Sequence, residues 1–167
     1  MTHPSAFQPA SAFQPHDHAH CAGEVLARAE ALATARGLRF TPIRRRVLEI
    51  LAESHRALGA YEVLDRLAAE GHAHQPPLAY RALEFLEGQG FAHRIRRLNA
   101  FAACMHPGEA HTAAFLICRT CNAIAEAPAA PVAKAMSKAA ATLGFTIERS
   151  TLEATGLCPA CQEPACP

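Results

Sequence analysis

The chain has 167 residues, of which 50% are hydrophobic and 19% are charged, and its formal net charge is +1. This length suits one large domain or two small ones, and so small a net charge does not by itself indicate a nucleic-acid binder. No run approaches the roughly 18 apolar residues of a membrane span, and residues 1–23 lack the basic and apolar regions of a secretory signal. We therefore expect a cytoplasmic protein whose seven cysteines are metal ligands or free thiols rather than disulfides.

Residues 1–22 are predicted to form a disordered, histidine-containing tail. The tail carries the near-repeat SAFQPA and SAFQP, followed by the stretch HDHAHC, which ends at Cys21. Such a stretch is compatible with weak metal scavenging and equally with a segment that has no function.

Four helices are predicted next, from apolar residues that recur at helical spacing. Thr41 and Pro42 are a helix-start signal, since threonine caps a helix and proline is favoured at its first position. The fourth helix has a polar outer face, follows a turn at residues 71–77, and is closed by glycines. The predicted spans are residues 24–36, 41–55, 60–70 and 78–88.

Residues 91–104 predict a β-hairpin with its turn at Leu98 and Asn99. Short helices joined by tight turns and followed by a two-stranded ribbon are typical of a winged helix, so residues 23–104 are predicted to be a DNA-binding domain. Arginines on the ribbon would then face the DNA backbone. Charge alone fits a solvated surface equally well.

The C-terminal third predicts a small α+β domain. Residues 105–112 are polar, contain proline and glycine, and are predicted to form a hinge. Within residues 113–167 we expect strands at 114–118 and 123–126, a helix at 131–143, and a last strand from 145 to about 153. A domain this small needs a covalent or metal staple, or a partner subunit, to be stable.

Two C-x-x-C pairs supply that staple. Each pair can bend into a knuckle with both sulfur atoms on one side, and two knuckles complete a tetrahedral set around Zn²⁺. Four protein ligands leave no open position, so the site is predicted to be structural. A redox dithiol or an iron site is the weaker alternative. The predicted ligands are Cys118, Cys121, Cys158 and Cys161.

A second candidate metal site involves the hairpin. If the turn is at Leu98 and Asn99, His93 lies directly opposite Cys104, and if the turn shifts by one residue the two are diagonal neighbours. Both registers put them on one face, because side chains alternate along a strand. With His111 from the hinge and Glu126 from the C-terminal domain they would form a metal site that joins both domains. The alternative is separate surface histidines and one buried thiol.

The order of these motifs resembles the ferric uptake regulator superfamily over about residues 24–161, and within it the zinc uptake regulator branch. The resemblance rests on TPxR from Thr41, Ala60-Tyr61, PPxxYRAL from Pro76, QGFAH from Gln89, His111-Thr112, the two C-x-x-C pairs and Gly144-Phe145. It implies an N-terminal winged helix and a C-terminal dimerisation domain in a homodimer. It also implies the four-cysteine structural zinc and a regulatory zinc at His93, Cys104, His111 and Glu126, which makes two zinc ions per chain.

The resemblance further implies a zinc-responsive repressor that binds double-stranded operator DNA and controls zinc uptake genes, with no small-molecule substrate and no membrane partner. We expect Arg81 and Tyr61 to contact bases, whereas the role of Tyr80 is left open between packing and a backbone contact. Phosphate contacts are expected from Arg44, Arg94, Arg96 and Arg97.

Three alternatives differ in chemistry. An iron, manganese or peroxide sensor would keep the fold and change the signal, and a zinc storage or delivery protein would bind no specific DNA. An enzyme is not expected, because the H-x-E and H-E-x-x-H patterns of zinc deaminases and proteases do not occur. A third metal site at His72, His74 and His106 is less favoured than exposed histidines. Cys21 and Cys166 have no predicted role.

Overall fold

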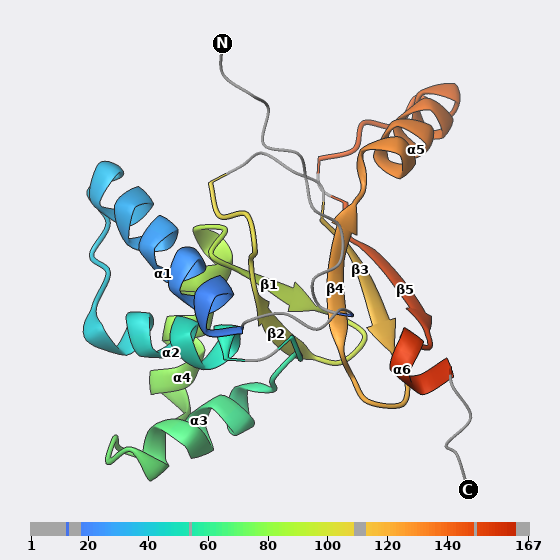
Figure 1. Cartoon of the computed structure of the whole chain (residues 1–167). Coiled ribbons are helices and arrows are strands. Elements are labelled where there is room, and N and C mark those ends of the chain that lie inside the picture. Colours follow the sequence, from blue (N-terminus) through green and yellow to red (C-terminus); the bar gives the residue numbers. More distant parts are fainter. Residues whose placement is uncertain (1–12, 14–17, 54, 109–112, 149, 163–167) are drawn as a thin grey trace, which may run out of the picture. The chain divides into compact units, whose positions relative to one another are not determined.

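The structure of the chain is a computed structural model. It describes residue 13 and residues 18–53, 55–108, 113–148 and 150–162. The chain divides into two compact units (Figure 1), an N-terminal unit of His16–Glu109 and a C-terminal unit of Ala110–Pro167 grouped with Met1–Pro15. The limits predicted from the sequence for the tail, the hinge and the two domains stay predictions.

The N-terminal unit consists of four helices followed by a hairpin. These are α1 (His18–Ala35), α2 (Pro42–Ala52), α3 (Ala60–Ala69), α4 (Pro76–Gly88), β1 (Ala92–Ile95) and β2 (Ala100–Ala103). Helix α1 begins six residues before the predicted start at residue 24, so it includes part of the stretch assigned to the tail. Helix α4 includes two prolines that were assigned to the preceding turn.

Proline explains where two of these helices begin. Pro42 follows Thr41, whose side-chain oxygen accepts a hydrogen bond from the backbone N–H of Arg44, as expected for an N-cap. Pro76 occupies the first turn of α4 after Gln75, a position where the missing N–H costs nothing. The sequence predicted the start of α2 correctly and placed the start of α4 two residues late.

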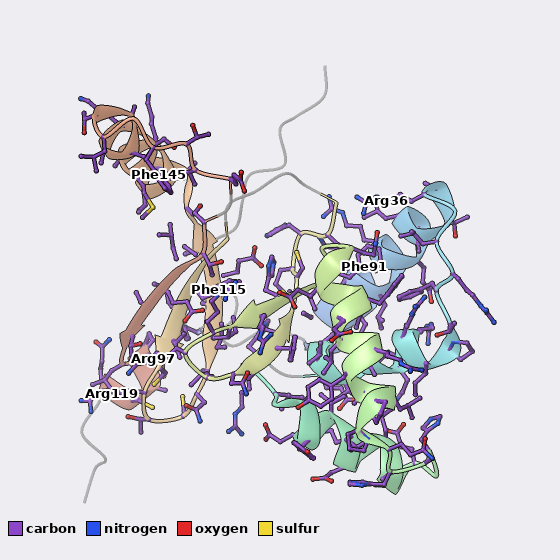
Figure 2. The ribbon with its side chains drawn as sticks, turned by 180° about the vertical axis from the view of Figure 1, so that it is seen from behind. Arg36, Phe91, Arg97, Phe115, Arg119 and Phe145 are labelled. Atoms are coloured by element: carbon purple, nitrogen blue, oxygen red, sulfur yellow. The ribbon has the colours of Figure 1, made fainter. Side chains whose placement is uncertain are left out.

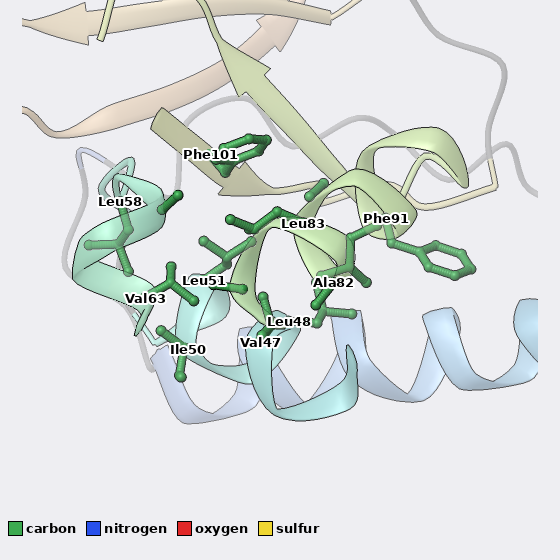
Figure 3. Close-up of a cluster of buried hydrophobic side chains, with 14 of the residues drawn as sticks. Val47, Leu48, Ile50, Leu51, Leu58, Val63, Ala82, Leu83, Phe91 and Phe101 are labelled. Carbon is green, nitrogen blue, oxygen red and sulfur yellow. The ribbon is translucent and has the colours of Figure 1, made fainter. Parts of the chain in front are cut away.

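One hydrophobic core holds the N-terminal unit together (Figure 3). Helices α2, α3 and α4 each direct leucines inward, and Leu48, Leu67 and Leu83 have no measurable exposure. Phe91, at the start of the hairpin, is equally buried and lies edge-on to the ring of Phe40. The core therefore joins α4 and the hairpin in one rigid unit. Because one side of α4 is buried in this core, its opposite side is exposed.

The hairpin completes a winged helix, although its turn differs from the prediction. Strands β1 and β2 pair antiparallel with His93 opposite Ala102 and Ile95 opposite Ala100. The turn has four residues, 96–99, rather than two, and Asn99 adopts a left-handed backbone with φ of 47°. Leu58 bridges to Phe101, which ties the segment before α3 to the ribbon.

The C-terminal unit is a three-stranded sheet with two helices. Its elements are β3 (Ala113–Cys118), β4 (Ile124–Pro128), α5 (Ala130–Thr142), β5 (Leu152–Gly156) and α6 (Pro159–Gln162). The strand order is β4-β3-β5, with β3 antiparallel to β4 and parallel to β5. Helix α5 extends from one end of the sheet (Figure 1), and only Ala140 of it is buried.

The prediction of a last strand from residue 145 to about 153 was wrong in its position. Strand β5 begins at Leu152, and Phe145, which suggested a strand, is 67% exposed beyond the end of α5 (Figure 2). The pairing with β3 explains the shift, because Gly156 must lie opposite Cys118 for the next cysteine pair to reach the first. Within the described ranges, none of the helices combines the length and apolar character that crossing a bilayer requires.

Candidate metal centres and DNA-reading face

The two cysteine pairs leave the sheet from neighbouring strand ends. Cys118 is the last residue of β3, and Cys158 follows β5 by two residues. The parallel register places Cys118 opposite Gly156, and the backbone N–H of Arg119 donates to the carbonyl of Gly156 at 2.9 Å. Parallel strands have their carboxyl ends at the same edge, so both knuckles start side by side.

Local backbone geometry then folds each pair into a knuckle. The first pair lies in the turn between β3 and β4, where Asn122 takes a left-handed conformation with φ of 58° that asparagine tolerates. The second pair is held by short helix α6, in which the N–H of Cys161 donates to the carbonyl of Cys158. The four sulfur atoms all lie within 4.8 Å of one another.

The four cysteine thiols differ in how readily they lose a proton, which bears on metal binding. Backbone N–H groups of Cys121 and Cys158 lower the pKa of Cys118 to about 6, which favours the thiolate that binds metals. By contrast, neighbouring thiols, Cys158 first, raise the pKa of Cys161 to about 12, so four unliganded sulfur atoms do not ionise together. A divalent cation removes that conflict, and an all-thiolate tetrahedral set suits structural zinc.

A second pair of ligand atoms lies on the wing ribbon. Ala102, not Cys104, is directly opposite His93, so His93 and Cys104 are diagonal neighbours across β1 and β2. The predicted direct pairing was wrong because the turn has four residues. The expectation that both lie on one face is confirmed, since a shift of two residues preserves the alternation, and a ring nitrogen of His93 lies within 4.8 Å of the Cys104 sulfur.

The other predicted ligands of this second site are spread along the chain. Glu126 lies on β4 of the C-terminal unit, opposite Phe115, and is partly buried. His111 falls outside the described residues. The described part of the chain does not gather His72, His74 and His106 into a shared group of ligands; instead His74 Nε2 lies 2.9 Å from the Asp65 carboxylate.

Helix α4 presents a polar outer face. Ala79, Ala82 and Leu83 are buried against the core, while Tyr80 and Arg81 project outward. Tyr80 is 41% exposed, and Tyr61 on α3 is 60% exposed. No hydrogen bond or ion pair to another described residue engages the Arg81 guanidinium, so it is available to a ligand.

The three consecutive arginines of α2 are used inside the unit. Arg45 binds the carboxylates of Glu30 and Glu49, and Arg46 binds those of Glu49, Glu53 and Glu70. The hydrogen bonds that Arg46 donates to the Glu70 carboxylate are the main reason that the pKa of Arg46 is raised. The Arg44 guanidinium lies 3.6 Å from the centre of the Phe85 ring. The phosphate contact predicted for Arg44 stays a prediction.

The wing carries exposed arginines at its turn. Arg96 and Arg97 occupy the four-residue turn, and Arg94 on β1 is exposed on the strand. The Arg94 guanidinium donates to Asn99 Oδ1 at 2.9 Å and lies 5.7 Å from the Phe101 ring centre. These contacts hold the Arg94 side chain along the ribbon. Arg94, Arg96 and Arg97 are all exposed to solvent.

Comparisons with known proteins agree with this geometry. The model of the Ferric uptake regulator family matches residues 35–155. The chain is 39% identical over 141 residues to the zinc uptake regulation protein of Escherichia coli (strain K12), which covers 84% of this chain and 82% of that protein. The protein of the same description from Shigella flexneri matches equally well.

Solved structures give the same picture. A zinc uptake regulator complexed with zinc and DNA is 40% identical, with a TM-score of 0.78 over 84% of this chain and 94% of that chain. The crystal structure of holo XcZur is also 40% identical, with a TM-score of 0.74 over 83% of this chain and 96% of that chain. The mixed architecture predicted from the sequence, a winged helix followed by a small α/β domain with four cysteines, is thus confirmed.

The four-thiol group generates a testable prediction. Cys161→Ser removes one ligand of a closed tetrahedral site, so we expect tightly held zinc to fall by about one ion per chain and the C-terminal unit to lose most of its thermal stability. Metal analysis after mild chelation, together with thermal unfolding, measures both quantities. Thr120→Ala, between the two cysteines of the other pair and without a ligand atom, is the control. Unchanged tightly bound zinc in Cys161→Ser would remove that residue from the site.

Proposed function

Because the chain belongs to the ferric uptake regulator family, we propose that it is a zinc-responsive repressor that binds operator DNA as a homodimer and controls zinc uptake genes. The single observation that carries the proposal is the pair of His93 and Cys104, whose ligand atoms lie within 4.8 Å on the ribbon of the DNA-binding unit. A regulator of this family needs the metal signal to reach DNA contacts, and this pair is part of the wing itself.

We assign a second zinc ion per chain to this pair, completed by His111 and Glu126. The donor set would contain two imidazoles, one thiolate and one carboxylate, and a thiolate favours zinc over the iron or manganese of a related sensor. Bound there, zinc would supply a fixed tetrahedral junction between residues of both units. The four-cysteine group would keep its own zinc as a structural ion.

The ligands themselves determine how zinc would control DNA binding. His93 and Cys104 belong to the wing, whereas Glu126 belongs to β4, so only one arrangement of the units lets all ligands meet. A metal shifts an equilibrium only by its differential affinity for the two states. Zinc would therefore select the arrangement competent for DNA, and operator DNA would tighten zinc binding by the same factor.

Exposed groups on α3 and α4 are suited to reading DNA. Arg81 makes no hydrogen bond or ion pair with another described residue, and such a guanidinium can bind guanine O6 and N7 through two hydrogen bonds. Tyr80, next to it in the sequence, and Tyr61 on α3 are exposed aromatic groups. The arginines of the wing would bind phosphates and fix the register of α4 in the major groove.

The C-terminal unit offers a surface for a second copy of the chain. Val132 and Met136 on α5, and Leu143 just after it, are between 41% and 83% exposed, although all three are large and apolar. An isolated helix of 13 residues is marginally stable, so an exposed apolar side on α5 needs a partner. Two copies joined here would present two winged helices to a pseudo-palindromic operator. Such a repressor works in the cytoplasm, where its thiols stay reduced.

The base-reading role assigned to Arg81 can be tested by substitution. Arg81→Ala should lower discrimination between operator and unrelated DNA by roughly 5-fold to 150-fold, because the guanidinium supplies about 1–3 kcal/mol of base selectivity. Binding of the zinc-loaded protein to both DNAs at fixed salt measures this ratio. Arg119→Ala, an exposed arginine of the C-terminal unit, is the control and should not change it. Full selectivity in Arg81→Ala contradicts the assignment.

The zinc-sensing role of Cys104 calls for a different experiment. Cys104→Ser replaces a thiolate by a hydroxyl that is a poor zinc ligand, so operator binding should require at least about 10-fold more free zinc. Titration of free zinc during operator binding measures this midpoint. Ala102→Ser, the matched control, places the same hydroxyl directly opposite His93 and should leave the midpoint unchanged. Equal midpoints for Cys104→Ser and the unmodified chain exclude Cys104 as a ligand.

A further inference from the structure

Helix α4 carries a negative charge on the same outer face as its DNA-reading arginine. Glu84 follows Tyr80 by four residues and Arg81 by three, and all three side chains are exposed. Residues spaced three and four apart are neighbours on a helix surface. With about 1.5 Å of rise per residue, Glu84 lies about 4.5 Å beyond Arg81 along the helix axis.

The Glu84 carboxylate has no structural use within the described part of the chain. No hydrogen bond or ion pair with another described residue is made by Glu84 or by Arg81, although their spacing permits one. The acidic residues of α2, α3 and their ends behave differently, because each holds a hydrogen bond inside the unit. These are Glu49, Glu53, Glu62, Asp65 and Glu70.

A carboxylate on a DNA-reading helix is unfavourable unless a base compensates for it. Duplex DNA carries one negative charge for about every 1.7 Å of its axis, so an unpaired carboxylate near it is repelled. The major groove offers one donor that suits a group which only accepts hydrogen bonds, the N4 amino group of cytosine. Adenine also exposes an amino group, but its acceptor N7 lies beside that group and repels a carboxylate.

We propose that Glu84 is a specificity-determining residue, which accepts a hydrogen bond from the amino group of a cytosine one or two base pairs from the base read by Arg81. The spacing follows from the 4.5 Å offset on the helix and about 3.4 Å between successive base pairs. The inference rests on the proposed function, since it requires α4 to enter the major groove. Arg81 and Glu84 would then read two bases of opposite hydrogen-bonding character.

The substitution Glu84→Gln tests this pairing because it keeps the shape and changes the hydrogen-bonding pattern. Glutamine both donates and accepts, and it matches N6 and N7 of adenine. In selection of zinc-loaded full-length protein on random duplex DNA, we expect one position of each half-site to change from C·G to A·T. Preference for cytosine at that position should fall by roughly 10-fold or more, while the other positions keep their bases.

Control variants distinguish a hydrogen bond between Glu84 and cytosine from simple repulsion between the Glu84 carboxylate and DNA phosphates. Glu87→Gln removes the same charge from the same helix, three residues further from its start, and should leave every base preference unchanged. If Glu84→Gln instead tightens binding to all sequences equally, Glu84 only repels phosphates and the inference is overturned. An unmodified chain that selects no motif with zinc would overturn the proposed function itself. A selected motif that depends on Arg81 but not on Glu84 would overturn only the cytosine contact.

Discussion

The parallel pairing of β3 with β5 is the constraint on which the C-terminal unit depends. It sets Gly156 beside Cys118, and so starts two cysteine knuckles from one edge of the sheet. Three short strands bury little apolar surface, and α5 contributes almost none, because only Ala140 of it is buried. Zinc bound by the four cysteines, as we propose, would supply the stability that this small core lacks. The same small core leaves apolar side chains of α5 exposed, and we propose that a second copy of the chain covers them.

The arginines divide into two groups with different partners. Those of α2 bind carboxylates or an aromatic ring of their own unit, whereas Arg81 on α4 has no such partner among the described residues. Under the proposed function, this division would give a nearly neutral chain a local surface that reads DNA, because paired charges contribute little to the binding of an outside ligand. Glu84 resembles Arg81 in this respect, since it also makes no hydrogen bond or ion pair with another described residue, although its charge is opposite.

One four-residue strand connects metal and DNA in the proposed mechanism. Along β1, His93 is half-buried on the face shared with Cys104, while the next residue, Arg94, is exposed. Alternation along a strand makes this separation unavoidable. A metal held by His93 would therefore order the backbone that carries Arg94, and under the proposal this short strand would both bind zinc and contact phosphate.

Much of this arrangement could be predicted from the sequence, for identifiable reasons. The C-x-x-C spacing defines a knuckle locally, and the shared face of His93 and Cys104 survives any register shift of two residues. The direct pairing of those two residues failed because the left-handed Asn99 permits a four-residue turn. The uses of Arg45 and Arg46 were not predictable either, since Glu30 and Glu70 lie far from them in the sequence and are brought near only by packing.

The most direct test of zinc control is a stepwise zinc titration of the chelator-treated full chain, with bound zinc per chain and operator affinity followed together. We predict that the first equivalent resists mild chelation and restores the fold without specific DNA binding, and that the second, weaker equivalent restores operator affinity. High operator affinity at one equivalent, with the second site empty, would contradict the regulatory role of the wing metal site.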